Sequence, residues 1–305
     1  MSNAEIRRSF DQISRVYDAT REPLRPATVG RVARELRRAG VRSILEIGVG
    51  TGRIARPLTD RGFEVTGADL SLGMLGRARK KHLDRLVRAS GYRLPFAPRS
   101  FDATLMVHVL HMLDRPGAVL REAARVSRVG TFALVNPRRG RRPLARRPLE
   151  ESPRRLLASI LKEAGHSIPP GRGPPHGERK VLVRLPPDSM RIVERRRVRI
   201  SIAAQLDRFG RRGQRNLLHI PPPALRRAVR IAKQRVGDRA ITVPRVVGLA
   251  LWKAERRRGG GATSRTGAPS RTAGRRPPRS TRARSASGAR TARRTGSARR
   301  TPASR

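Results

Sequence analysis

Three glycines alternate with other residues along one short stretch of the chain. Gly48, Gly50 and Gly52 follow the apolar run SILEI and precede a predicted helix. Glycine adopts left-handed backbone angles and lets the main chain come close to a ligand. The order acid-x-G-x-G-x-G lacks the G-x-G-x-x-G spacing of dinucleotide-binding turns and the Gly-Lys-Ser/Thr of phosphate loops. The stretch therefore predicts a binding turn for an adenosine-like ligand.

An acidic residue ends the next apolar run. Asp69 lies 17 positions after Gly52, at the end of FEVTGAD. A carboxylate in this place accepts hydrogen bonds from the two hydroxyls of a ribose. The alternative role is an N-cap of the helix that follows, but Ser71 is an equally good cap. We therefore expect Asp69 to be available to the ligand.

Two histidines follow the longest apolar run and are the candidates for proton transfer. His108 falls near the end of FDATLMVHVL, and His111 lies three residues further along. Such a histidine acts as a general base only where the reacting group carries a proton at neutral pH. A packing or capping role is the alternative for both residues. The sequence assigns no catalytic residue.

The elements that must position these residues alternate between strands and helices as far as residue 137. The pattern predicts strands at 42–48, 63–69, 86–90, 101–110 and 130–137, with helices at 26–39, 53–60, 72–81 and 116–127. Such alternation forms a parallel sheet covered on both faces. Further along, we expect a helix at 154–165, strands at 180–185 and 191–202, helical segments over 200–237, and a strand at 243–252.

The composition is strongly basic. The 305 residues carry a net charge of +49, from 65 arginines and six lysines against 22 acidic residues. This charge indicates either a polyanion partner or the arginine bias of a GC-rich genome, and in both cases nonspecific nucleic-acid binding at low salt. The lack of cysteine excludes thiol chemistry and fits a cytoplasmic location. We expect no signal peptide and no membrane span.

The last fifty residues differ from the rest. The segment 256–305 holds 16 arginines and no acidic residue, and it lacks Leu, Ile, Val, Phe, Trp and Tyr. Such a segment cannot bury a core, so we expect a disordered tail. It serves either as an electrostatic tether or as solvated chain without a partner.

Four blocks together resemble a known family. EIGVGTG, ADLSLGMLGRAR, LPFAPRSFD and HVLHML come in the order and at the spacing of the class I S-adenosylmethionine-dependent methyltransferases of small-molecule type, over residues 10–137. The resemblance implies an α/β fold with a Rossmann-like, doubly wound, mostly parallel seven-stranded sheet and helices on both faces. It also implies S-adenosylmethionine as cofactor. The chain would then divide into a lid helix at 1–25, a cofactor-binding half at 26–137, a C-terminal part with substrate-lid insertions at 138–255, and the tail at 256–305.

The resemblance also implies roles for individual residues. The implied cofactor site comprises Glu46, Gly48, Gly50, Thr51, Gly52, Asp69, Leu70, Met74, Ser90, Gly91, Tyr92 and His108. The family often has an aspartate where Ser90 stands, and a hydroxyl accepts a hydrogen bond less strongly than a carboxylate. Tyr17 of the lid, His108 and His111 are the implied substrate contacts. Plain core packing is the alternative for Tyr17.

Three functions remain open from the sequence. The first is methyl transfer to a small-molecule acceptor by direct in-line displacement, with no metal ion. The second is RNA methylation, with the basic tail supplying affinity. Aromatic residues make up only 3% of the chain, which is scarce for stacking on bases. The third is a non-catalytic protein that binds the cofactor or RNA on the same scaffold.

Overall fold

Seven strands of the chain pair side by side in one sheet. The computed structural model describes residues 3–22, 24–137, 148–168, 178–211 and 217–254. Within them the strands are β1 (Ser43–Ile47), β2 (Glu64–Asp69), β3 (Leu86–Arg88), β4 (Phe101–Val107), β5 (Ser127–Val135), β6 (Ser189–Ser201) and β7 (Ala240–Lys253). Their spatial order is β3-β2-β1-β4-β5-β7-β6. The first five run parallel, and β7 pairs antiparallel with both β5 and β6. The predicted seven-stranded, mostly parallel sheet is confirmed.

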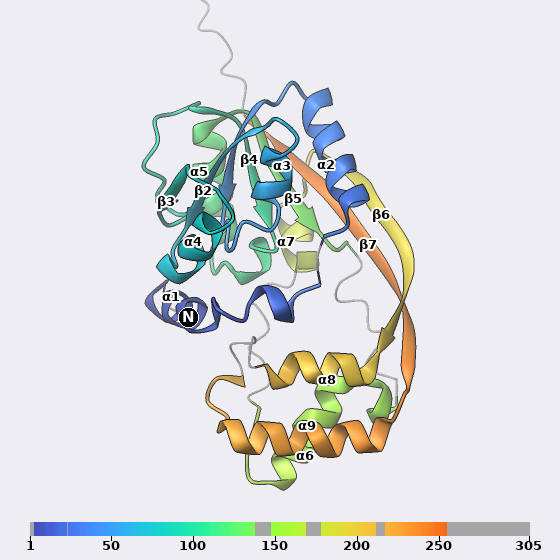
Figure 1. Ribbon diagram of the computed structural model, residues 1–305. Coiled ribbons are helices and arrows are strands. Elements are labelled where there is room, and N and C mark those ends of the chain that lie inside the picture. Colours follow the sequence, from blue (N-terminus) through green and yellow to red (C-terminus); the bar gives the residue numbers. More distant parts are fainter. Residues whose placement is uncertain (1–2, 23, 138–147, 169–177, 212–216, 255–305) are drawn as a thin grey trace, which may run out of the picture. The chain divides into compact units, whose positions relative to one another are not determined.

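Helices cover both faces of this sheet (Figure 1). One face packs against α2 (Pro26–Arg38), α3 (Ala55–Thr59) and α4 (Leu72–Arg79), and the other against α5 (Pro116–Val126) and α7 (Glu178–Arg184). Neighbouring residues of β1 show why both faces must be covered, because Ile44 belongs to the first buried cluster and Leu45 to the second.

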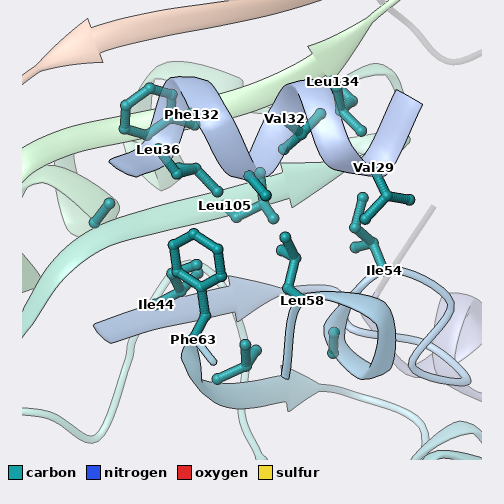
Figure 2. Packing of buried hydrophobic residues seen from close by; sticks show 14 of the residues in the cluster. Val29, Val32, Leu36, Ile44, Ile54, Leu58, Phe63, Leu105, Phe132 and Leu134 are labelled. Carbon is teal, nitrogen blue, oxygen red and sulfur yellow. The ribbon is translucent and has the colours of Figure 1, made fainter. Parts of the chain in front are cut away.

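The helix α2 shows how sequence spacing produces this packing. Val29, Val32 and Leu36 recur at helical spacing and are buried. Figure 2 shows them lying over Leu105 and Phe132 of the neighbouring strands. The helix begins with Pro26, whose fixed φ angle suits the first helical position.

The two last strands form a long ribbon that extends past the parallel part of the sheet. β7 pairs with β5 only from Gly248 to Lys253, while its pairing with β6 continues to Ala240. Beyond this point a third buried cluster forms among α6 (Pro153–Glu163), α8 (Ile202–Gly210) and α9 (Pro222–Val236). The ribbon joins this helical part to the sheet (Figure 1). The chain thus holds apolar clusters on the sheet and a separate one on the helices.

The N-terminal helix α1 (Asn3–Ile13) lies beside α4 and is held there by one carboxylate. Asp11 accepts hydrogen bonds from the Ser71 hydroxyl, at 2.6 Å, and from the Gly73 N–H, at 2.9 Å. A short 3₁₀ turn, Asp18–Thr20, then leads to α2. These contacts fix the N-terminal segment at the beginning of α4.

The strand predicted over 180–185 is wrong, because this segment lies mostly in the helix α7 (Glu178–Arg184). The alternation of valines in KVLVRL is typical of a strand. In the structure Leu182 and Leu185 pack against the second cluster, while Val183 is 71% exposed. Helical spacing therefore buries Val181, partly buries the leucines and leaves Val183 in solvent. The other predicted strands and helices are present, with shifted ends.

Several predicted segments lie outside the described residues. These are most of the basic loop after Asn136, the Pro/Gly-rich loop around 169–177, and the tail 256–305. Among the helices that the structure describes, none has the length and apolar composition needed to cross a membrane.

Candidate active site

A pocket opens where β1, β2 and β4 end, between the sheet and α1. Its free volume is about 900 Å³, including the part open to solvent. Parallel sheets bind their ligands at this edge, outside the carboxyl ends of the strands. Ten of the predicted site residues line the pocket, namely Tyr17, Gly48, Gly50, Asp69, Leu70, Met74, Ser90, Gly91, Tyr92 and His108. We call it the first pocket.

The glycine turn after β1 has left-handed backbone at all three glycines, with φ of 74° at Gly48, 56° at Gly50 and 75° at Gly52. A Cβ added at Gly48 would lie 2.5 Å from a methyl group of Val109, and one at Gly52 would lie 2.3 Å from a methyl group of Leu83. A Cβ at Gly50 meets no atom within 4 Å. The backbone angle therefore requires glycine at all three positions, and packing requires it additionally at Gly48 and Gly52, whereas the space beside Gly50 is open.

Asp69 joins the glycine turn to α4. Its carboxylate accepts the Gly50 N–H at 2.8 Å and the Ser71 N–H at 2.9 Å. Burial raises the pKa of Asp69, while the N–H groups of Ser71, Gly50 and Leu70 oppose this rise. Ser71 itself caps α4 by accepting the Met74 N–H at 3.0 Å, as the sequence predicted. Each carboxylate oxygen keeps a lone pair for a further donor.

Four predicted site residues lie outside the lining of the first pocket. Thr51 is buried and donates its hydroxyl to Asp18 at 2.6 Å. Gly52 packs under Leu83, and His111 is the middle residue of the short turn Leu110–Met112. Glu46 is the fourth, and it is buried within β1.

The carboxyl group of Glu46 is buried away from water. Glu46 is 2% exposed, and its Oε2 has no hydrogen-bond partner among the described residues. Burial raises the pKa of Glu46 well above its usual value, and the neighbouring charge of Asp69 raises it further. The Ala55 N–H opposes this rise. Glu46 therefore favours its neutral form far more than an exposed glutamate does.

The N-terminal segment closes one side of the pocket. Tyr17 lines it together with Phe10, and the two rings meet edge to face with centroids 6.3 Å apart. Asp18 does not face the pocket but binds Thr51 and Lys81, each at 2.6 Å. Burial alone raises the pKa of Asp18, but these two hydrogen bonds outweigh it and lower the pKa. Asp18 therefore anchors the segment as a carboxylate.

The loop after β3 forms the opposite wall. The Ser90 hydroxyl accepts the Tyr92 N–H at 3.3 Å, and the Tyr92 hydroxyl accepts the Arg115 N–H at 3.2 Å. The Arg115 guanidinium also lies over the Tyr92 ring, 5.4 Å from its centroid. Gly91 is required by packing, since a Cβ there would come within 3.1 Å of Ile47 and Val119. The loop therefore presents a fixed edge to a ligand.

His108 stands where β4 ends and has an unusual backbone. Its φ of 57° lies in the left-handed region, which costs free energy for a residue with a Cβ. The His108 side chain is 48% exposed, and its Nδ1 lies 3.9 Å from Glu178 Oε1. His111 Nδ1 lies 3.2 Å from the same oxygen, without the alignment of a hydrogen bond.

Glu178 begins α7 and its side chain is 1% exposed. Its Oε2 accepts the Asn136 N–H at 2.8 Å. Burial alone raises the pKa of Glu178, but His108, His111 and the Asn136 N–H outweigh it and hold the pKa far below its usual value. Glu178 is thus a buried carboxylate at neutral pH. No cluster within the described residues has the make-up of a metal site.

A second pocket lies on the other side of His108. Its free volume is about 740 Å³, including the part open to solvent. The lining combines the end of β5 with the β6–β7 ribbon and the chain before α2: Glu22, Leu24, His108, Leu134, Val135, Asn136, Val198, Ile200, Val243, Pro244, Arg245, Val246 and Val247. Arg245 pairs with Glu22 and lies 3.7 Å from Glu194, so the charged part of the wall is balanced.

Residues 45–135 match the family model described as "Methyltransferase domain". They contain the glycine turn, Asp69, the loop after β3 and His108. These residues are therefore similar to a methyltransferase domain.

Curated relatives are similar over the same part of the chain. A demethylmenaquinone methyltransferase from Renibacterium salmoninarum is 33% identical over 138 residues, which are 43% of this chain and 57% of the relative. One from Tropheryma whipplei is 36% identical over 149 residues, 45% of this chain and 62% of the relative. The chain thus spans about six tenths of the length of the curated relatives it matches.

A solved structure, the CcbJ methyltransferase from Streptomyces caelestis, aligns over 44% of this chain and 59% of that chain. The identity is 26% and the TM-score is 0.38.

The residues present fit S-adenosylmethionine, the cofactor that the resemblance to methyltransferases implies. Asp69 has free lone pairs for ribose hydroxyls, and Leu70, Met74 and Val109 supply apolar walls for an adenine. Gly50 leaves the space that a side chain would fill. The role of each residue remains a prediction.

Sequence reasoning missed two features beyond the methyltransferase domain. Glu178 follows the Pro/Gly-rich loop and stands just before the segment 180–185 that was predicted as a strand. Its partners His108 and His111 are 70 and 67 positions away in sequence. The second pocket depends on the pairing of β6 with β7. No local pattern signals either feature, because both arise from contacts distant in sequence.

Proposed function

We propose that this chain is an S-adenosylmethionine-dependent methyltransferase that methylates a small, largely apolar acceptor. The supporting observation is the first pocket, which Tyr17 and His108 line together with apolar residues and which α1 covers on one side. An open basic cleft would have favoured RNA. The curated relatives are named for methylating demethylmenaquinone, a small molecule, which agrees with this proposal.

The cofactor supplies a methyl group on a positively charged sulfur, which keeps the electron pair of the carbon–sulfur bond when a nucleophile takes the methyl. The chain's own work is then mainly alignment. Asp69 and the glycine turn hold the adenosyl part, and the N-terminal segment excludes water through Phe10 and Tyr17. We further propose the division into a lid at 1–25, a cofactor half at 26–137, a substrate part at 138–255 and a tail at 256–305.

Calorimetric titration with S-adenosylmethionine and with its demethylated product tests the cofactor site. We expect binding by the wild type and a loss of about tenfold or more in Asp69→Ala, because the ribose hydroxyls lose a charged acceptor. Asp84→Ala is the matched control, since Asp84 is exposed and lines neither pocket. Absence of heat in the wild type would overturn the proposed function.

Removal of the tail tests the acceptor class. A chain that ends at Glu255 loses 16 positive charges. We expect it to keep its turnover with small acceptors at 150 mM salt, since both pockets lie in the remaining chain. An enzyme that acts on RNA would instead lose most of its affinity for RNA, because contacts between basic side chains and phosphates supply most of that affinity. Cofactor binding without transfer to any acceptor would favour the non-catalytic alternative.

A further inference from the structure

His108 is the residue that the two pockets share. It lines the first pocket beside Tyr17 and Gly48, and the second pocket beside Val135 and Arg245. Its left-handed backbone turns the chain at the end of β4. Strained residues persist where the surrounding structure enforces them, and they gather at functional sites. An imidazole in this place reaches any group that passes from one pocket to the other.

Glu178 fixes which side of the imidazole faces the pockets. Its Oε1 lies 3.9 Å from His108 Nδ1, and its Oε2 is itself held by the Asn136 N–H. A carboxylate beside Nδ1 favours the tautomer that carries its proton there. The other ring nitrogen, Nε2, then has a free lone pair and no partner among the described residues. This is the arrangement of a general base with a carboxylate behind it.

Other titratable and charged groups lie beside His108 or line the two pockets that it shares. They are Glu178 of α7, His111 of the turn after β4, Asp69, Asp114 and Arg7 around the first pocket, and Glu22 and Arg245 around the second. Glu22 and Arg245 pair with each other, so they cancel. Glu178 is the one buried carboxylate in contact with the imidazole.

The second pocket suits an uncharged, apolar body. Leu134, Val198, Ile200 and Val243 are among its walls, and its arginine already has acidic partners. An acceptor held there meets His108 at the junction of the pockets. A base at that junction is useful only for a nucleophile that carries a proton at neutral pH, and a hydroxyl on an aromatic ring is such a group.

We propose that the second pocket binds a hydroxylated aromatic acceptor, that His108 Nε2 takes the hydroxyl proton, and that Glu178 is the positioning residue for His108. This inference rests on the proposed function and adds the acceptor site and the base. In the proton step the acceptor's O–H bond breaks and its electron pair stays on the oxygen. The proton binds Nε2, and the imidazolium charge is balanced by Glu178. The oxygen is then the nucleophile for the methyl group.

Nitrogen NMR of the histidine rings tests the role of Glu178 without any substrate. At pH 8 we expect wild-type His108 to carry its proton on Nδ1. In Glu178→Met, which removes the acceptor, the proton should move largely to Nε2. Glu178→Gln keeps an oxygen acceptor and should give an intermediate result, which serves if the methionine variant does not fold. His82, exposed and also at positive φ, should not change. A wild-type His108 protonated on Nε2 overturns the proposal.

Turnover with a matched pair of probes tests the base and the acceptor class. 1-Naphthol and 1-naphthylamine have the same apolar body, but only naphthol needs to lose its proton to a base before attack. We expect methylation of naphthol by the wild type and a loss of about 100-fold in kcat for His108→Ala. Glu178→Gln should lower kcat with little change in KM, and Glu178→Asp should recover part of it. His82→Ala is the matched control and should retain full activity.

The outcomes separate this inference from the proposed function. Calorimetry with the demethylated cofactor should give the same affinity, within threefold, for wild type, Glu178→Gln and His82→Ala. If the wild type binds cofactor but does not methylate naphthol, prefers naphthylamine, or keeps its rate in His108→Ala, the acceptor class or the base is wrong while the cofactor site stands. If the wild type does not bind the cofactor, both proposals fail together.

Discussion

Glu46 shows how burial decides the behaviour of a single carboxyl group. The residue stands at the acidic position before the glycine turn, and sequence resemblance implies a place near the cofactor. In the structure it lies inside β1, with one oxygen unpaired and its pKa raised. The folded chain therefore binds a proton at Glu46 at pH values where the unfolded chain has released it.

The free energy of unfolding should consequently depend on pH through Glu46. Between pH 4.5, the usual pKa, and the raised pKa of the folded state, stability falls as pH rises, because the folded chain binds more protons. The Glu46→Gln variant has no titrating group at this position, so this pH dependence of the free energy of unfolding is absent from it. We expect the variant to match the wild type near pH 4 and to exceed it increasingly at pH 6 and pH 8, as measured by urea unfolding.

The control for this comparison is Glu64→Gln, an exposed surface glutamate paired with Arg85. Its difference from the wild type should stay within about 0.5 kcal/mol at each pH. A Glu46→Gln variant that loses stability relative to the wild type as pH rises would contradict the assigned burial effect.

At the scale of the elements, α1 depends on polar anchors more than on its own core. Its last residue, Ile13, is buried, but the helix is attached to α4 through Asp11, which accepts the Ser71 hydroxyl and the Gly73 N–H. A hydrogen bond to a charged group contributes about 1.5–3 kcal/mol. The position of α1, and with it one wall of the first pocket, therefore depends in part on these two bonds.

Removal of this anchor should loosen α1 alone. In Asp11→Ala we expect the backbone amides of α1 to exchange with solvent about tenfold faster or more, while those of β1 and β4 stay protected. Hydrogen exchange followed by mass spectrometry measures both. Arg8→Ala, an exposed change on the same helix, should leave the exchange unchanged. Equal loosening of the whole sheet would show that the anchor has a global role.

The elements also show what the sequence can and cannot predict. The parallel strands were predictable because β1 and β4 are continuous apolar runs followed by turn residues. The helix α7 was not, since seven residues with alternating valines fit a strand as well as a helix. The same limit applies to the site. Asp69 and Gly50 follow a local motif, whereas Glu178 reaches His111 only through tertiary packing.

At the scale of the whole molecule, the described chain has two kinds of hydrophobic core. Two clusters cover the sheet, and a third lies among α6, α8 and α9 at the end of the β6–β7 ribbon. Ile200 and Val243 pack against the third cluster and line the second pocket, but no residue of the third cluster lines the first pocket, where the cofactor would bind. The stability of the third cluster should be separable from cofactor binding.

A cavity in the third cluster tests this separation. Leu225 is fully buried there, and Leu225→Ala should cost about 2–4 kcal/mol. We expect α6, α8 and α9 to exchange their amides faster and to melt before the sheet, with the affinity for the demethylated cofactor unchanged. Leu36→Ala, a similar change in the first cluster, should instead lower the main transition. A parallel loss of cofactor affinity in Leu225→Ala would refute independent cores.

The glycine turn indicates which residues selection for a stable fold preserves without selection for activity. Gly48 and Gly52 are fixed by backbone angle and by contact with Val109 and Leu83, and Gly50 alone leaves space toward the ligand. Selection for a stable fold is enough to preserve all three glycines, because each has a left-handed φ angle. A descendant that had abandoned methyl transfer would therefore keep the three glycines and reveal its loss at Asp69.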